Sequence, residues 1–306
     1  MKRLNITWES GVMDTTGYLF SFAKSLGTVV KNSPYAKMAE DIIATSGFAF
    51  RMWVAKDLCP SATSIWIFDD QKRWVENGGL ICRYAGRYWG QEDIEEQKRL
   101  EALDIIKQSI DNNIPAVSWD IGVPEWGLIT GYEDQTQKLA TLAITGAENE
   151  MSYEKLGKRE LPILSVLTIV GMKQKDPEQI LKDTLKIASS HLNGEEWCDN
   201  AKGLAAYPAL IKHFEEHFNP EISWNMEYYL GTYGALKYYA YKYFQKMGLT
   251  QLTTLYENIY NCWKEAYDIK RSEDINNVAV RDIIAGLLKT AYENEKKATR
   301  LMTDSM

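Results

Sequence analysis

The first half of this sequence contains no histidine, and this absence limits the chemistry that half can perform. All three histidines lie in the C-terminal part of the chain, at positions 191, 213 and 217. A cysteine or serine nucleophile needs a neighbouring base before it becomes reactive at neutral pH. The N-terminal half therefore lacks the imidazole that most thiol and serine enzymes use.

Other absences narrow the class of protein. The four cysteines form no CxxC pair, which argues against a zinc ribbon or a disulfide scaffold. No GxGxxG or other phosphate-binding glycine loop occurs, so we expect no cofactor. The chain has no basic run and a formal net charge of −7, which argues against binding DNA or RNA. No apolar stretch reaches the length of a membrane span or resembles a signal peptide, so we expect a cytoplasmic protein with reduced thiols.

Strand and helix patterns are mixed in the first part of the chain, and helical patterns alone fill the second. Alternating or β-branched apolar residues predict strands at 1–12, 79–87, 116–120, 127–132, 138–144 and 162–170. Capping residues and a 3.6-residue period predict helices at 14–26, 34–45, 93–110, 177–192, 203–217, 225–247, 251–268 and 275–301. This order predicts an α+β domain over residues 1–172 and an α-helical domain over residues 173–306.

Aromatic residues are abundant, with ten tryptophans and eighteen tyrosines. A cluster of the tyrosines surrounds the predicted helix 225–247 on several sides. A helix with large side chains all round is typically buried, so we expect this helix to be central to the helical domain.

Several short motifs occur in an order that resembles one family. They are SGFAFR at 46–51, LCPSATSIW at 58–66, PAVSWDIGVPEWGLITGYED at 115–134, GLAAY at 203–207 and LLKTAYENEKKA at 287–298. Together they span most of the chain, which resembles the family of the butirosin-biosynthesis acyltransferase. The N-terminal domain of that family is similar to papain-like and bacteriocin-processing cysteine peptidases. The resemblance implies a papain-like fold for residues 1–172 and acyl or amide transfer onto a small molecule.

The chain departs from this family where catalysis would take place. The resemblance implies a nucleophilic cysteine at the start of the first helix, but residues 11–16 read GVMDTT. It also implies a histidine at the opening of a later strand, where this chain has Trp126 and Gly127. An acidic pair, Glu133 and Asp134, remains in the place of an orienting carboxylate. We therefore expect a catalytically altered or inactive relative, a pseudoenzyme that has lost the thiol–imidazole pair.

The loop between predicted strands 116–120 and 127–132 is the strongest candidate for ligand binding. It carries two carboxylates and two indoles, from Trp119, Asp120, Glu125 and Trp126. The carboxylates could hold a cationic or polyhydroxy ligand while the indoles stack on it. The alternative is an ordinary hairpin with solvated acids and tryptophans that close the core. We expect this loop, with Asp14 and Asp134, to line a cleft between the domains that binds a small polar or acyl-linked metabolite.

Two active alternatives stay open, and either would make the chain a working acyltransferase or amidase. Cys59 precedes Pro60 and could lie at a helix N-terminus, where amide dipoles favour the thiolate. The alternative is a small buried hydrophobic residue, which is what a free cysteine commonly is. The hydroxyl of Thr15, with Asp14 beside it, could also replace the thiol, although Asp is a routine helix cap.

A third alternative is a zinc hydrolase. The sequence HFEEH at residues 213–217 matches the inverted zinc-protease pattern. His213 and His217 could share a metal, with Glu216 as the base. Asn219 and Pro220 end this helix at once, so a coincidental match on a solvated helix stays open beside it. The expected partner is a small molecule or an acyl carrier protein, and a homo-oligomer is left open.

Overall fold

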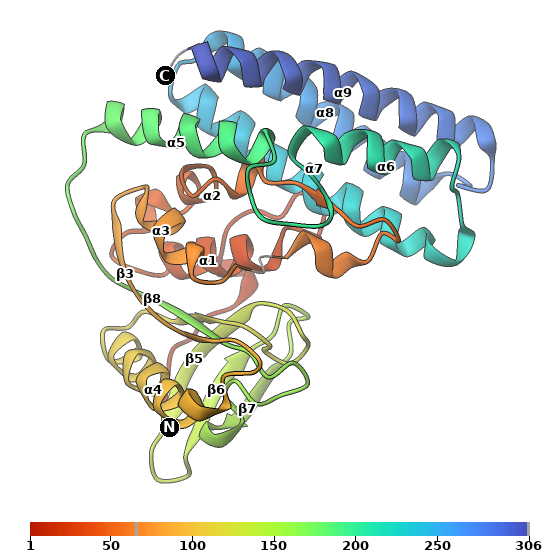
Figure 1. Ribbon diagram of the computed structural model, residues 1–306. Coiled ribbons are helices and arrows are strands. Elements are labelled where there is room, and N and C mark those ends of the chain that lie inside the picture. The colour runs from red at the N-terminus through yellow and green to blue at the C-terminus, as the bar shows by residue number, and fades with distance from the viewer. Residues whose placement is uncertain (65–66, 305–306) are drawn as a thin grey trace. The chain divides into compact units, whose positions relative to one another are not determined.

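The computed structural model describes residues 1–64 and 67–304, and the protein is α+β (Figure 1). It divides into two compact units, each assembled from separate stretches of chain. Unit 1 comprises Met1–Met13, Ser21–Ile42 and Trp66–Lys175, and unit 2 comprises Asp14–Phe20, Ile43–Ile65 and Asp176–Met306. The last boundary lies close to the predicted division at residue 172. The sequence predicted two continuous domains. In the structure, two short early segments group with the C-terminal helices instead.

Unit 1 is built on an antiparallel sheet of seven strands among the described residues. The strands are β1 (Lys2–Arg3), β3 (Leu80–Arg87), β4 (Ala116–Ser118), β5 (Gly127–Glu133), β6 (Lys138–Leu142), β7 (Glu148–Ser152) and β8 (Leu164–Met172). Their order is β3-β8-β4-β5-β6-β7, and β1 pairs with β5. Five of the predicted strands are therefore confirmed in place. The strand predicted over 1–12 is wrong beyond Lys2–Arg3, and β7 was not predicted because its polar residues do not alternate with apolar ones.

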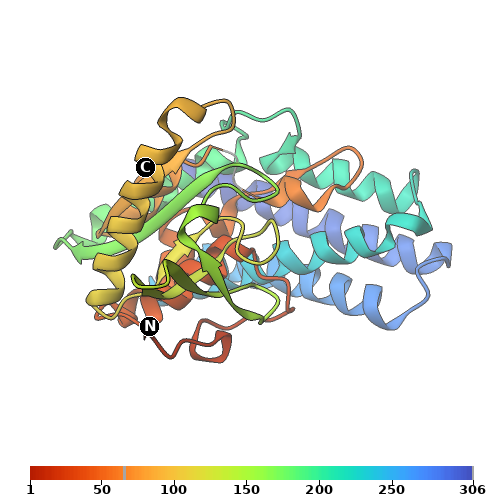
Figure 2. The ribbon, with the colours of Figure 1, turned by 90° about the horizontal axis from the view of Figure 1, so that it is seen from below.

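The helices of unit 1 cover this sheet. They are α1 (Ser21–Lys31), α3 (Asp70–Glu76) and α4 (Glu95–Asp111), and the chain passes from unit 1 to unit 2 within α2 (Asp41–Thr45). Figure 2 shows α4 running beside β8, and its stripe of Ala102, Ile106 and Ile110 is fully buried. Residues 127–131 of β5 are all buried, which requires cover on both faces of the strand. Both α1 and α4 contact β5 and supply that cover.

The first long helix begins seven residues later than its sequence pattern predicts. Oδ1 of Asp14 accepts hydrogen bonds from the backbone N–H groups of Gly17 and Leu19, at 2.8 and 3.1 Å. The carboxylate thus closes a loop, and α1 starts only at Ser21. Gly27 lies inside α1 and does not end it. The glycine has no side chain, and its Cα faces Val12. A Cβ at position 27 would lie 2.8 Å from both methyl groups of that valine, so the glycine permits close packing.

Unit 2 contains five long helices and one two-stranded ribbon among its described residues. The helices are α5 (Pro177–Leu192), α6 (Ala206–Glu215), α7 (Ser223–Lys246), α8 (Thr250–Ser272) and α9 (Val278–Asp304). The ribbon pairs β2 (Trp53–Val54) with β9 (Ala201–Lys202). All five helices lie where the periodicity predicts them. The tyrosine-rich α7 is central as expected, since Tyr229, Tyr233 and Tyr239 are almost fully buried.

The segment around residues 48–54 is part of the core of unit 2. Phe50 is fully buried, and its ring lies 5.6 Å from the rings of Phe244 and Tyr256. The backbone N–H of Trp53 donates to the hydroxyl of Tyr233 at 2.8 Å, and the same hydroxyl donates to the carbonyl of Trp53. This early segment therefore completes the helical core rather than the sheet.

Candidate functional site

The start of α1 carries a serine that is hydrogen bonded to a carboxylate of the candidate loop. Ser21 is the first residue of α1, and its hydroxyl donates to Oε2 of Glu125 at 2.5 Å. Glu125 lies two residues before β5 begins. The first-turn N–H groups of a helix have no partners within the helix and favour a nearby negative charge. Glu125 is thus positioned by the helix and by the sheet, both within unit 1.

The two tryptophans of the loop belong to the core of unit 1. Trp126 is fully buried and Trp119 is 5% exposed. The Trp126 ring lies 5.2 Å from that of Trp119, 4.9 Å from Phe22 and 5.3 Å from Phe68. Neither indole presents a face on which a ligand could stack, so the expectation of aromatic stacking is corrected. The second interpretation, in which the tryptophans close the core, describes them.

Asp120 is buried and held in a left-handed backbone conformation. Its φ angle is 58°, and 4% of the residue is exposed. Arg159 fixes the loop, because its guanidinium donates to the carbonyls of Asp120 at 3.0 Å and Gly122 at 3.2 Å. Burial raises the pKa of the Asp120 carboxyl, and the positive charge of Arg159 opposes that shift. Asp120 therefore shapes the loop from inside, whereas Glu125 is partly exposed.

Asp134 lies at the other end of β5 from Glu125. The seven residues of β5 lie between the two and correspond to roughly 20 Å of strand. Asp134 instead pairs with Lys107 at 2.5 Å and accepts a hydrogen bond from Tyr153 at 3.1 Å. The hydrogen bond from Lys107 lowers the pKa of Asp134. A carboxylate so placed cannot orient a group beside Glu125, and its expected place in the same site is corrected.

The residues considered for an active enzyme lie in unit 2. Cys59 precedes a 3-10 helix of four residues, Pro60–Thr63, and its Sγ lies 3.0 Å from Oγ of Ser61. No imidazole is hydrogen bonded to this thiol among the described residues.

The hydroxyl of Thr15 is buried and makes no hydrogen bond with the described residues. Asp14 accepts from the loop backbone, so it shapes the loop rather than capping a helix.

The zinc alternative gains no support from the geometry. Helix α6 ends at Glu215, and Glu216 and His217 lie just beyond it, with the rings of His213 and His217 6.1 Å apart. His213 is 8% exposed, whereas the His217 side chain is 61% exposed. In the described part of the chain no three His, Cys, Asp or Glu side chains are grouped closely enough to hold a metal ion. A pair of histidines without a third ligand falls short of a zinc site.

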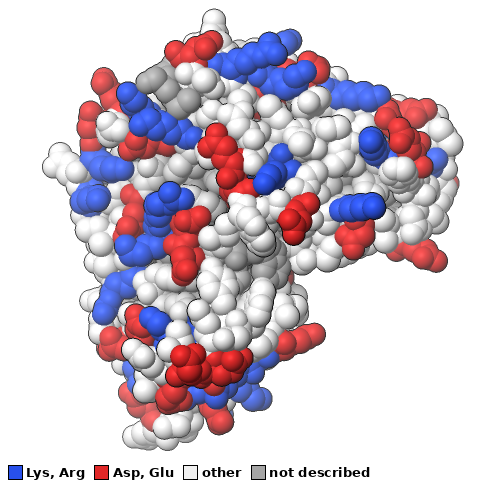
Figure 3. All heavy atoms as spheres, viewed as in Figure 1, with Lys and Arg blue, Asp and Glu red and all other residues white. Residues whose placement is uncertain are grey.

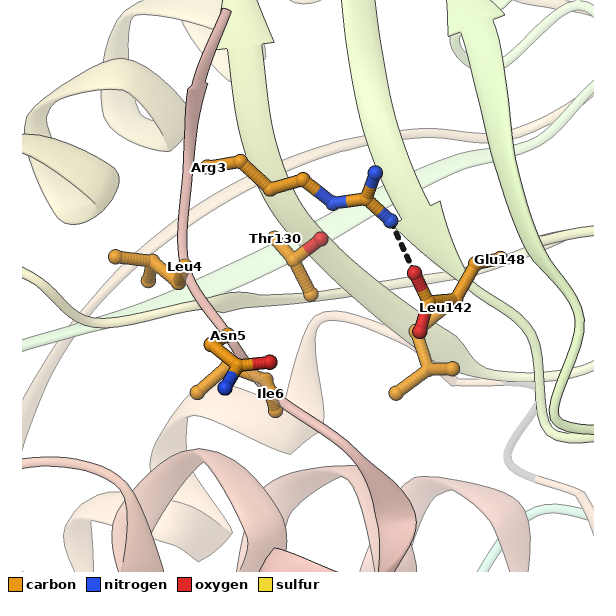
Figure 4. Close-up of a pocket in the computed structure, with 7 residues that line it drawn as sticks. All are labelled: Arg3, Leu4, Asn5, Ile6, Thr130, Leu142 and Glu148. Atoms are coloured by element: carbon orange, nitrogen blue, oxygen red, sulfur yellow. Dashed lines mark hydrogen bonds and ion pairs between the residues drawn. The ribbon is translucent and has the colours of Figure 1, made fainter.

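Two of the cavities in the described part of the chain are lined by residues of unit 1. The smaller, of about 280 Å³, lies between residues 3–6 and strands β5 and β6 (Figure 4). Figure 4 shows Arg3 extending toward Glu148, with which it forms an ion pair. The larger cavity, of about 420 Å³, lies beside Gly122 and Arg159. Arg159 was not identified as a site residue from the sequence. An isolated arginine does not indicate which loop it contacts, and this loop lies 39 residues away.

On the face seen in Figure 3, Lys and Arg side chains are interspersed with Asp and Glu side chains. None of the helices within residues 1–64 and 67–304 combines the length and apolar character needed to cross a bilayer.

Comparison with known proteins adds no assignment. No family model matches the chain, and no curated protein is similar enough to count as a relative.

Proposed function

We propose that this chain is a catalytically altered relative of the butirosin-biosynthesis acyltransferase family that binds a small polar or acyl-linked metabolite through unit 1. The observation that carries the proposal is the hydrogen bond between Ser21 and Glu125. In a papain-like unit the nucleophile begins the first helix and the base comes from the later sheet. A serine at the start of α1 and a carboxylate just before β5 would suit these two places, and this supports the proposal.

A serine–carboxylate pair supports binding better than it supports thiol-type catalysis. An ordinary carboxylate has a pKa of about 4 and accepts a proton from a hydroxyl far less readily than imidazole does. The single cysteine in the sequence of unit 1, Cys82, is 4% exposed, and burial raises its pKa to about 12. A thiol so buried stays protonated and inaccessible at neutral pH.

The partly exposed Glu125 carboxylate favours a ligand that carries an amine or several hydroxyl groups. A thermal-stability screen with polyamines, aminoglycosides and aminoacyl compounds tests this, because a ligand of the folded state raises its apparent stability. At about 100 times Kd the gain is about 2.7 kcal/mol. We expect Glu125→Gln to weaken binding about tenfold, since the glutamine keeps the acceptor for Ser21 but loses the charge.

Asp93→Asn is the matched control, because it removes one exposed negative charge from unit 1 and should leave the stabilisation unchanged. Equal loss in both variants, or no stabilisation by any amine or polyol, would contradict the proposal. Rapid labelling of Ser21 by a fluorophosphonate would also contradict it, and so would acyl transfer that disappears in Cys59→Ala. Either result would show that a nucleophile is active.

A further inference from the structure

The larger cavity of unit 1 has the size of a small-molecule site and an excess of positive charge. Its volume is about 420 Å³, within the range of roughly 300–1,000 Å³ that is common for ligand pockets. The residues used below all line it, and they are Gly122, Asn149, Glu150, Ser152, Lys155 and Arg159. They come from the candidate loop, from β7 and from the segment that follows β7.

Glu150, the acidic residue of this lining, is already paired. Its carboxylate lies 2.7 Å from Nζ of Lys138, and that hydrogen bond lowers its pKa. Lys155, in contrast, forms no ion pair or side-chain hydrogen bond with the residues that the structure describes, and it is exposed. Its ammonium group is therefore available to a ligand.

Arg159 is held in a fixed orientation by neutral carbonyl groups. These groups do not neutralise its positive charge. Two of its N–H groups donate to the carbonyls of Asp120 and Gly122, and a guanidinium has five such donors. The nearest carboxylate atom is Oδ1 of Asp120, 3.8 Å away, which is beyond hydrogen-bonding distance. Burial of Asp120 also disfavours its charged form. A guanidinium fixed in this way loses little freedom when it binds an oxyanion.

Neutral donors also line the cavity. Neither the amide of Asn149 nor the hydroxyl of Ser152 makes a side-chain hydrogen bond within the described part of the chain. Two cations with such donors around a concave space are the groups that recognise oxygen anions. The cavity of Figure 4 lacks this feature, because the charge of Arg3 is met by Glu148.

We propose that this cavity is an oxyanion-binding site that takes the phosphate or carboxylate group of a small metabolite through Lys155 and Arg159. The site does not depend on the proposed function, although it shares the 119–126 loop with Glu125. A metabolite with an anionic group could bind here whether or not an amine binds near Ser21.

The test is isothermal titration of the full-length protein with inorganic phosphate and, separately, with citrate, at constant ionic strength set by chloride. Binding of phosphate alone assigns a phosphate ligand, and binding of citrate alone assigns a carboxylate ligand. Lys155→Gln is expected to lower the affinity for the anion about tenfold, because a hydrogen bond between charged groups is lost. Arg159→Lys keeps the charge but loses the planar donors, and it should also weaken binding.

Lys173→Gln is the control, since it removes an exposed positive charge of unit 1 that makes no ion pair in the described residues. If Lys155→Gln and Lys173→Gln weaken binding equally, the effect is general electrostatics and the proposal is overturned. Absence of binding by either anion at tens of millimolar overturns it as well. Glu125→Gln should leave anion binding unchanged, so this proposal and the proposed function can fail separately.

Discussion

Replacing Glu295 by leucine should lower the free energy of unfolding by about 3–5 kcal/mol, the usual cost of removing one partner from a buried ion pair. Glu295 and Lys237 are both fully buried in unit 2, and Nζ of the lysine lies 2.6 Å from Oε1 of the glutamate. Burial lowers the pKa of Lys237, while the charge of Glu295 opposes that shift. Without the carboxylate, the lysine must lose its proton or draw water into the core.

Two further groups donate directly to the same carboxylate, and a third is linked to it through one of them. The hydroxyls of Tyr256 and Tyr207 donate to it at 3.0 and 2.6 Å, and the indole N–H of Trp263 donates to the hydroxyl of Tyr207 at 2.9 Å. Losing the acceptor leaves buried donors unsatisfied, and each such group adds to the cost. The network should therefore behave as a unit rather than as a single pair.

Urea unfolding followed by far-ultraviolet circular dichroism measures this effect. Glu293→Leu is the control on the same helix, because Glu293 is exposed and pairs with Lys296 at the surface, and its change should stay within about 0.5 kcal/mol. The double variant Lys237→Met, Glu295→Leu should recover part of the loss, since no charge is then left buried without a partner. Equal stability of Glu295→Leu and the unchanged protein would show that the pair contributes nothing.

Acid should destabilise the protein through Glu196, a buried carboxylate of unit 2. Burial alone would raise its pKa, but the charge of Arg51 and the hydrogen bond from His191 outweigh burial and hold the pKa at about 2. Nε of Arg51 lies 2.9 Å from Oε2, and Nδ1 of His191 lies 2.5 Å from Oε1. Arg51 also stacks on the ring of Trp53, 4.1 Å from its centre, so the cluster is anchored on one side.

The sign of the pH effect follows from the lowered pKa. Glu196 is charged in the folded state down to about pH 2, whereas its ordinary value is 4.5. Its contribution is therefore fully present above about pH 4.5 and is lost as the pH falls toward 2, with a size of about 3 kcal/mol. Glu196→Gln should be less stable by about that amount at pH 7 and should lose less stability between pH 6 and pH 3.

The neighbouring Glu195→Gln is the matched control, because Glu195 is exposed, and it should keep the acid sensitivity of the unchanged protein. Chemical unfolding of the unchanged protein and of both variants, at pH 6 and at pH 3, supplies the six free energies that are compared. Identical pH dependence in the two variants would place the acid-sensitive group elsewhere.

Local signals predicted the helices of unit 2 well and the beginning of α1 poorly. Helix α5 runs over Pro177–Leu192 as predicted, because Asp176 caps it by accepting from the N–H of Glu178 at 3.2 Å. The same residue type at Asp14 closes a loop instead. An Asp side chain accepts from free backbone N–H groups at the start of a helix and also in a turn. Its presence in the sequence therefore does not distinguish the two.

The candidate site was predicted only in part, for a physical reason. The 119–126 loop and Glu125 stand out in the sequence, because acids and aromatics between two strand patterns are conspicuous. Ser21 does not, since its partner lies 104 positions away and the pairing exists only once the helix and the sheet have come together. The same holds for Arg159, whose role is visible only through the two carbonyls that it bonds.

The division of the chain into interleaved segments has a consequence for biosynthesis. Every stretch of unit 1 leaves the ribosome before residue 176, whereas the apolar segment around Phe50 and Trp53 must wait for α7 and α8 to be translated. During that interval these side chains lack their partners from α7 and α8, which makes them a natural target for a holding chaperone. A nascent chain of this protein is thus most vulnerable to aggregation midway through its synthesis, after the sheet is complete and before the last helices arrive.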